Sequence, residues 1–179
     1  MERRHLEALA QLGTADTWHY GASLLDHLQG TYRILRGWGS RDALCLAGLF
    51  HSIYGTTLFQ VRTVDRSRRA EIRGLIGAEA EELVHLFSVT DRTRYFGRRP
   101  EEGAVTLQDL VTGEALPVSP GALRDLIEIH VANDIEVFPH VLGKLESSRI
   151  RSVLELYERN GVWLSPAALA AVRELSTRL

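Results

Sequence analysis

The sequence predicts an all-α domain that carries one small β-hairpin excursion near residues 104–118. Leucines recur at three- and four-residue intervals through most segments, which is the periodicity of helices with one buried face. One segment, about 41–54, is apolar nearly all round, and such a helix is expected to lie at the centre of a fold. Only residues 104–118 change to a period of two, which is typical of strands.

Three helices are expected in the first third of the chain. The first covers residues 3–12 and carries charged residues between its leucines. After a loop, Ser23 begins a longer helix that ends at Gly37, because serine is a good N-cap and glycine a good terminator. The apolar helix, about 41–54, follows and is expected to end at Gly55.

The middle of the chain alternates loops with short helices. Residues 56–65 are expected to form a loop, and a basic helix should follow near 66–75. Gly77 separates this helix from another at about 78–90, whose stripe includes Leu83 and Phe87. Charged residues then continue to the start of the hairpin.

The hairpin and the helix after it have clear boundary signals. Gly113 lies between two short segments of alternating apolar residues, as expected for a hairpin turn. Ser119 and Pro120 begin a long helix by the rule of an N-cap followed by proline. This helix should run to about residue 137, and Pro139 is expected to close it.

Two further helices, about 148–160 and 166–178, complete the predicted order of elements. There is no repeat, linker or low-complexity segment, so residues 1–179 are predicted to form a single domain.

Composition excludes several classes of protein. A net charge of −2 argues against a nucleic-acid binder, which normally has a basic excess. The single cysteine, Cys45, allows neither an intramolecular disulfide nor a cysteine-based zinc site. The first residues lead into a charged helix rather than an apolar signal segment, and no run approaches the roughly 18 apolar residues that cross a bilayer. We therefore expect a cytoplasmic protein with neither a nucleic-acid nor a membrane partner.

Three of the predicted helices present a metal-type ligand on or beside an apolar face: His27, His51 and Asp134. A single histidine in such a place is often only a hydrogen-bonded core residue. A carboxylate there is different, because a buried Asp134 needs a cation or several hydrogen-bond donors. Only tertiary folding could bring these three residues together.

The local sequence around these residues resembles the HD-domain superfamily. The resemblance lies in Leu24-Leu25-Asp26-His27, in Ala-Gly-Leu-Phe-His-Ser-Ile-Tyr-Gly-Thr over residues 47–56, and in Val89-Thr90. It is nearest to the hydrolase domains of the stringent-response (p)ppGpp hydrolases, and a set of uncharacterised bacterial proteins shares the His-Ser-Ile-Tyr-Gly-Thr form.

In this family two histidines and two aspartates bind one divalent ion, usually manganese. The resemblance thus implies that His27, His51 and Asp134 are metal ligands.

The chain departs from this family at two points. Ser52 stands where the family has the aspartate of its His-Asp doublet, which removes an anionic ligand. Tyr54 and Gly55 stand where the (p)ppGpp hydrolases have an acidic pair, which removes the residues that handle the attacking water. Ordinary (p)ppGpp hydrolysis is therefore not expected.

Other residues could compensate for these losses. His130 lies four residues before Asp134 and so projects from the same helix face. His130 is therefore a candidate catalytic residue, and His85 is a further candidate ligand. Ser52 and Tyr54 are the other candidate catalytic residues, because they would form a hydrogen-bonding pocket with His51 and Asp134 if no metal is bound. A histidine-rich site suits manganese, iron or zinc better than magnesium.

Two further features have open interpretations. His19, in the loop before the His27 helix, could form a lid over the pocket or could be a packing residue. Two clusters of arginines could bind phosphate or carboxylate groups, or could form a solvated face that is offset by nearby acidic residues. The arginines are Arg62, Arg66, Arg68, Arg69, Arg73, Arg92, Arg94, Arg98 and Arg99.

The first functional hypothesis is a metal-dependent enzyme of the HD superfamily, of hydrolase or oxygenase type. Its substrate would be a small anionic or phosphorylated metabolite. The alternative is a degenerate HD fold that acts as a small-molecule binding or regulatory module, or as a metal-free catalyst. A third hypothesis is a homodimer formed through the apolar C-terminal helix, although that stripe could equally be tertiary packing.

Overall fold

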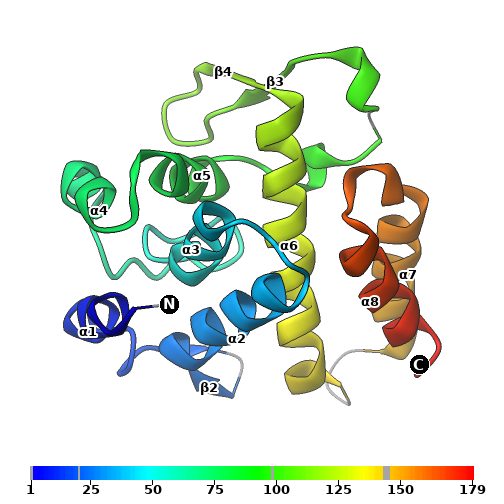
Figure 1. Cartoon of the computed structure of the whole chain (residues 1–179), viewed down its shortest axis with the longest axis horizontal. Coiled ribbons are helices and arrows are strands. Elements are labelled where there is room, and N and C mark those ends of the chain that lie inside the picture. Colours follow the sequence, from blue (N-terminus) through cyan, green and yellow to red (C-terminus); the bar gives the residue numbers. More distant parts are fainter. Residues whose placement is uncertain (1, 20, 98, 143–145) are drawn as a thin grey trace.

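The computed structural model describes residues 2–19, 21–97, 99–142 and 146–179. Within these residues the chain forms eight α-helices and two small antiparallel strand pairs, which confirms the predicted all-α class (Figure 1). The helices are α1 (Arg3–Gln11), α2 (Leu24–Gly37), α3 (Asp42–Phe50), α4 (Arg69–Ile76), α5 (Ala78–Val89), α6 (Pro120–Val141), α7 (Ser147–Arg159) and α8 (Pro166–Ser176).

The strands occur in two separate pairs. The predicted hairpin is β3 (Val105–Gln108) paired with β4 (Ala115–Val118), and Val105 lies opposite Val118. A second pair, β1 (Trp18–His19) with β2 (Ala22–Ser23), lies where only a loop was expected. Each of these strands has two residues, which is too short to produce a periodic sequence signal.

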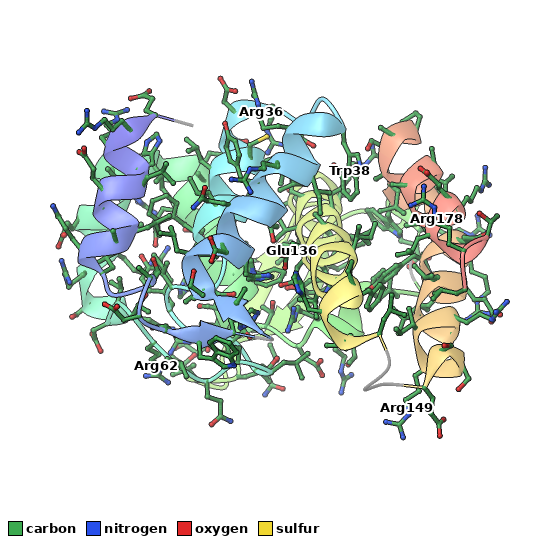
Figure 2. The ribbon with its side chains drawn as sticks, turned by 90° about the horizontal axis from the view of Figure 1, so that it is seen from below. Arg36, Trp38, Arg62, Glu136, Arg149 and Arg178 are labelled. Atoms are coloured by element: carbon green, nitrogen blue, oxygen red, sulfur yellow. The ribbon has the colours of Figure 1, made fainter. Side chains whose placement is uncertain are left out.

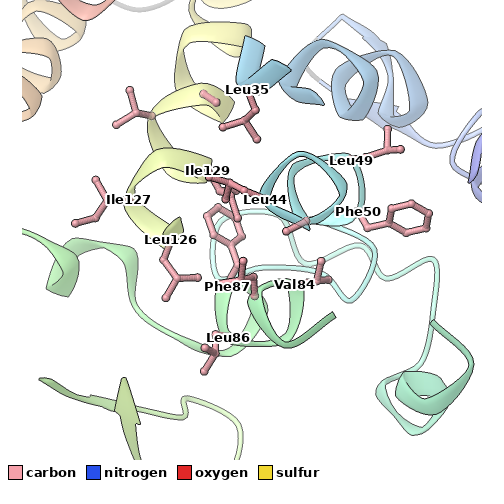
Figure 3. Packing of buried hydrophobic residues seen from close by; sticks show 14 of the residues in the cluster. Leu35, Leu44, Leu49, Phe50, Val84, Leu86, Phe87, Leu126, Ile127 and Ile129 are labelled. Atoms are coloured by element: carbon pink, nitrogen blue, oxygen red, sulfur yellow. The ribbon is translucent and has the colours of Figure 1, made fainter. Parts of the chain in front are cut away.

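Helix α6 is the central element of the fold. It runs through the middle of Figure 1 and contacts α2, α3 and α5 on one side and α8 on the other. Buried side chains of α3, α5 and α6 interlock in the close-up, with Phe87 near Leu126 and Ile129 (Figure 3). The apolar face of α8 packs in the same way, because Ala168 and Val172 are buried.

The helix starts follow the capping residues seen in the sequence. The Ser23 hydroxyl accepts a hydrogen bond from the Asp26 N–H at the start of α2. The Ser119 hydroxyl accepts one from the Ala122 N–H at the start of α6, with proline in the first turn. Each cap satisfies a backbone donor that has no partner inside its helix.

Two predicted helix ends were wrong. Helix α3 stops at Phe50 rather than near residue 54. The His51 ring donates a hydrogen bond to the carbonyl oxygen of Gly48 at 2.7 Å, and the chain continues as turns instead of helix. Helix α6 continues past Pro139 to Val141. A proline in the last turn removes one backbone donor only, and the helix lasts just two residues longer.

Gly48 allows α2 and α3 to pack closely against each other. A Cβ atom at this position would clash with the side chain of Leu35 on α2. His27 on α2 and His51 after α3 can therefore approach each other, which a larger residue at position 48 would hinder.

Across the described residues, no helix is both long and apolar enough to span a membrane.

Glu81 on α5 anchors the neighbouring helix and the turn after α3. It is fully buried, and it accepts hydrogen bonds from Arg69 at 2.6 and 2.9 Å and from the Tyr54 hydroxyl at 3.2 Å. Burial alone would raise the pKa of Glu81, but the hydrogen bonds and positive charge of Arg69 outweigh it and lower this pKa below its ordinary value. The carboxylate is therefore charged in the folded protein.

Replacing Glu81 with glutamine should destabilise the protein by about 2 to 4 kcal/mol at neutral pH, because Arg69 loses its buried counter-charge. Glu82 contacts the same arginine from an exposed position, so Glu82→Gln is the matched control and should cost about 0.5 kcal/mol or less. Urea unfolding measures both free energies.

The same comparison should depend on pH. Since folding lowers the pKa of Glu81, its stabilisation is present above the unfolded pKa of about 4.3 and is lost as the pH falls through the folded value. The gap between wild type and Glu81→Gln should therefore shrink in acid. A gap that stays constant down to the acid limit would contradict this description of Glu81.

Candidate functional site

The structure brings His27 of α2 and His51 together at the side of α6. Their Nε2 atoms lie 3.2 Å apart, and both side chains are buried. Phe87 of α5 stands edge-on to the His51 ring, at 5.3 Å between centroids. The pair therefore lies in the region where α2, α3, α5 and α6 meet.

Each ring of this pair has its other nitrogen held by an acceptor. Nδ1 of His27 contacts the carboxylate of Glu136 on α6, and Nδ1 of His51 faces the carbonyl oxygen of Gly48. A carbonyl or carboxylate can only accept, so both Nδ1 atoms carry the proton. In the neutral rings the Nε2 atoms then have no hydrogen, and their lone pairs face each other.

Glu136 reaches His27 because Gly30 leaves room on α2. A Cβ atom at Gly30 would lie 2.6 Å from Cγ of Glu136 and 2.9 Å from its Oε1. Figure 2 shows Glu136 between α2 and α6. Its other carboxylate oxygen lies 3.5 Å from Nε2 of His140, so this carboxylate lies between two imidazoles.

Asn133 supplies a third electron-rich atom beside the pair. Its Oδ1 lies 3.0 Å from Nε2 of His51, and its Nδ2 donates to Oδ1 of Asp134 at 2.8 Å. The bond to Asp134 fixes the orientation of the amide, so that the oxygen and not the nitrogen faces His51. The side chain of this segment that faces His51 is therefore that of Asn133, whereas Asp134, the predicted ligand, contacts Asn133.

Asp134 belongs to a second hydrogen-bond network that includes His130. The Tyr157 hydroxyl of α7 donates to Oδ2 of Asp134 at 2.5 Å and lies 3.3 Å from Nε2 of His130. Nδ1 of His130 lies 3.5 Å from a guanidinium nitrogen of Arg92. Arginine can only donate, so Nδ1 accepts and Nε2 carries the proton that points to the tyrosine oxygen.

Burial sets the charge of this network. Burial lowers the pKa of His130 to about 4, although the Asp134 carboxylate opposes the shift. Burial and the same carboxylate raise the pKa of Tyr157 well above its ordinary value. His130 and Tyr157 are thus both neutral at pH 7. The two donors to the Asp134 carboxylate, Tyr157 and Asn133, are therefore both uncharged.

A small cavity of about 60 Å³ adjoins the histidine pair. Ser52 lines it, so the serine of the His-Ser doublet does lie at the site. Its lining residues come from the β1 strand, the turn and loop after α3, the segment after α5, and α6. They are His19, Ser52, Thr56, Leu58, Phe59, Arg92, Asn133, Asp134 and Val137.

His19 packs against His27 and Phe59, as one of its two interpretations expected, and it also lines the cavity. Its ring lies 4.2 Å from that of His27 and 4.6 Å from that of Phe59, between centroids. Burial, with a smaller effect from His27, lowers the pKa of His19 to about 3. Burial also lowers the pKa of His51 well below its ordinary value, and the repulsion that a protonated His27 would exert adds to this shift.

Besides the histidine pair itself, three candidates do not line the cavity: His130, which belongs to the Asp134 network, Tyr54 and His85. The Tyr54 hydroxyl donates to Glu81, as described above, and Tyr54 does not line the cavity. His85 of α5 lies near Arg69 and Glu82 instead. Among the residues that the structure describes, no three histidine, cysteine, aspartate or glutamate side chains form a metal-type cluster.

Sequence reasoning missed three residues of the site and left the role of a fourth, Arg92, open. Asn133 and Glu136 are three residues apart on α6, which places them on one face, but nothing local distinguishes them from solvated polar residues. Tyr157 resembles any core tyrosine of α7. Arg92 was named in an arginine cluster that could either bind phosphate or carboxylate groups or form a solvated face, and the structure buries it, with 6% exposed.

Comparison with known proteins gives one similarity. Residues 8–92 match the family model of a domain of unknown function, DUF6817. This range includes His27, His51 and Arg92 and ends before the α6 residues of the site. No curated protein and no solved structure matches the chain.

The ring protonation derived above can be measured. Long-range proton–nitrogen NMR spectra of chelator-treated protein at neutral pH should show a protonated Nδ1 and a bare Nε2 for both His27 and His51. Glu136→Gln should weaken this preference in His27 and leave His51 unchanged, because the acceptor of His51 is backbone. A proton on Nε2 of either ring in the wild type would refute the assignment.

Proposed function

We propose that this protein is a metal-dependent enzyme with an HD-type site, of hydrolase or oxygenase class, that acts on a small anionic or phosphorylated metabolite. One observation carries the proposal: the Nε2 atoms of His27 and His51 face each other 3.2 Å apart, while each Nδ1 is held by an acceptor. With both Nδ1 atoms protonated, two lone pairs would repel at that distance, so either a metal ion or a shared proton must lie between or beside the Nε2 atoms. Imidazoles whose Nδ1 donates to a carboxylate or carbonyl are typical of metal ligands.

The distances fit one ion. Two nitrogens that each lie about 2.1 Å from a tetrahedral or octahedral ion are about 3.0–3.4 Å apart. Asn133 Oδ1 is close enough to His51 Nε2, at 3.0 Å, to be the third ligand. In this proposal Asp134 is not itself a ligand but orients Asn133, and Glu136 orients His27.

The ligand chemistry favours manganese, iron or zinc, since imidazole suits these ions better than it suits magnesium. A divalent ion at this site would supply a Lewis acid that activates water or polarises a substrate oxygen. Ser52 lines the adjoining cavity and offers a hydroxyl to the substrate. His130 acts through Tyr157 and Asp134 as a positioning residue, and Tyr54 has no part in the proposed chemistry.

A metal-free binding module is the second candidate. It is favoured by Ser52, which takes the place of a family ligand, and by the missing cluster of three metal-type side chains among the described residues. Here His27 and His51 would share a proton, and Asn133 and Asp134 would bind the ligand by hydrogen bonds. The two candidates differ in whether the isolated protein binds a divalent ion.

Cobalt(II) titration of chelator-treated protein tests the first candidate, because visible absorption reports the ligands directly. We expect about one ion per chain, with binding lost in His27→Ala and His51→Ala and weakened about 10- to 100-fold in Glu136→Gln. His85→Ala is the control and should bind as the wild type does. Elemental analysis of protein purified without added metal should show manganese, iron or zinc.

Absence of cobalt binding in the wild type would refute the metal site, as would binding that survives in both histidine variants. Glu136→Gln keeps the shape and size of the side chain, so it tests the site even if a histidine variant is unstable. Circular dichroism of each variant separates loss of binding from loss of fold.

A further inference from the structure

Arg92 is a buried cation that makes no ion pair with any carboxylate of the described residues. It begins the 3₁₀ turn Arg92–Tyr95 that follows α5, and 6% of it is exposed. Its guanidinium lies over the Phe87 ring at 4.9 Å, and its Nε is buried without a hydrogen-bond partner. Within the described part of the chain, no carboxylate lies within 4.0 Å of its nitrogens.

The acidic residues near Arg92 are engaged elsewhere. Asp91 caps the same turn through the Thr93 N–H and is paired with Arg94 on the surface. Asp134 accepts hydrogen bonds from Tyr157 and Asn133, one on each oxygen. The one side-chain hydrogen bond that Arg92 makes among the described residues is to the neutral His130, at 3.5 Å.

A buried charge normally has a paired counter-charge, because desolvation without a partner is costly. Arginine also presents a planar fork of donors that matches phosphate and carboxylate oxygens. The guanidinium therefore indicates an anion that the described residues do not supply at ion-pair distance.

The cavity beside Arg92 has the size of one such group. Its volume is about 60 Å³, and a water needs about 10–15 Å³ of comparable space, so about four to six atoms fit. Ser52 and Thr56 also line it, as does Asp134, whose two carboxylate oxygens already accept hydrogen bonds from Tyr157 and Asn133. The Thr56 hydroxyl accepts the Phe59 N–H at 3.0 Å, so its own proton can be donated to a ligand.

We propose that Arg92 binds the phosphate group of the substrate in this cavity, next to the His27–His51 pair. This inference rests on the proposed function, because the bound group would lie beside the metal ligands. Several donors, from Arg92, Ser52 and Thr56, favour the three free oxygens of a phosphate monoester over the two of a carboxylate. The rest of the substrate lies outside the cavity, beside Leu58, which is 74% exposed.

Calorimetric titration with inorganic phosphate tests this assignment, with acetate as the second probe. We expect the wild type to bind phosphate, and Arg92→Met to lower this affinity at least tenfold while keeping the apolar contact with Phe87. Arg92→Lys should also bind more weakly, because a single ammonium cannot form the fork. Arg94→Met, in the same turn with a side chain that is 78% exposed, is the control and should not change binding.

Stability provides a readout that a structural arginine would not give. Without phosphate, Arg92→Met should melt at the same temperature as the wild type or above it, because an unpaired buried charge is removed. Phosphate should raise the melting temperature of the wild type but not that of Arg92→Met. A large destabilisation of Arg92→Met, with phosphate binding retained by Arg92→Lys at full affinity, would overturn the assignment.

Other outcomes also decide the question. The proposal fails if the wild type binds neither probe at millimolar concentrations, or if Arg92→Met binds phosphate normally. Tighter binding of acetate than of phosphate, lost in Arg92→Met, would replace phosphate with a carboxylate. Cobalt titration of the same samples separates the two proposals: normal cobalt binding without an Arg92-dependent anion refutes only this one, and the reverse refutes only the metal site.

Discussion

The arrangement of the site depends on the two acceptors that hold Nδ1 of His27 and His51. Glu136 and the carbonyl of Gly48 fix the proton on the outer nitrogen of each ring, and so direct both Nε2 lone pairs to the same place. Both acceptors depend on glycine. Gly30 leaves space for Glu136, and Gly48 lets α2 approach α3. Packing of the helices and chemistry of the rings are thus determined by the same contacts.

Helix α6 joins the parts of the site. Glu136 reaches toward α2, Asn133 toward His51 at the end of α3, and Asp134 toward Tyr157 of α7. Consecutive positions on a helix point in different directions, so one short segment can serve three neighbours. Burial then keeps His130 and Tyr157 neutral, and the ionisable residues that line the cavity next to this network are Asp134 and Arg92.

Most of the fold could be predicted from the sequence, because caps and apolar periods are local signals. Ser23 and Ser119 begin their helices as expected, and the hairpin around Gly113 forms. The end of α3 was mispredicted because the bond from the His51 ring to Gly48 is a side-chain effect that periodicity does not report. Likewise, Arg92 has the same local pattern as the exposed Arg94, and only tertiary packing separates them.

The proximity of His27 and His51 was anticipated, but their partners were not, because those partners lie far away in the sequence. The most direct measurement of the central claim is anomalous diffraction from a crystal grown with cobalt(II). A metal site predicts a peak within about 2.0–2.3 Å of both Nε2 atoms and of Asn133 Oδ1. A peak elsewhere, or two rings that share a proton with no metal between them, would contradict it.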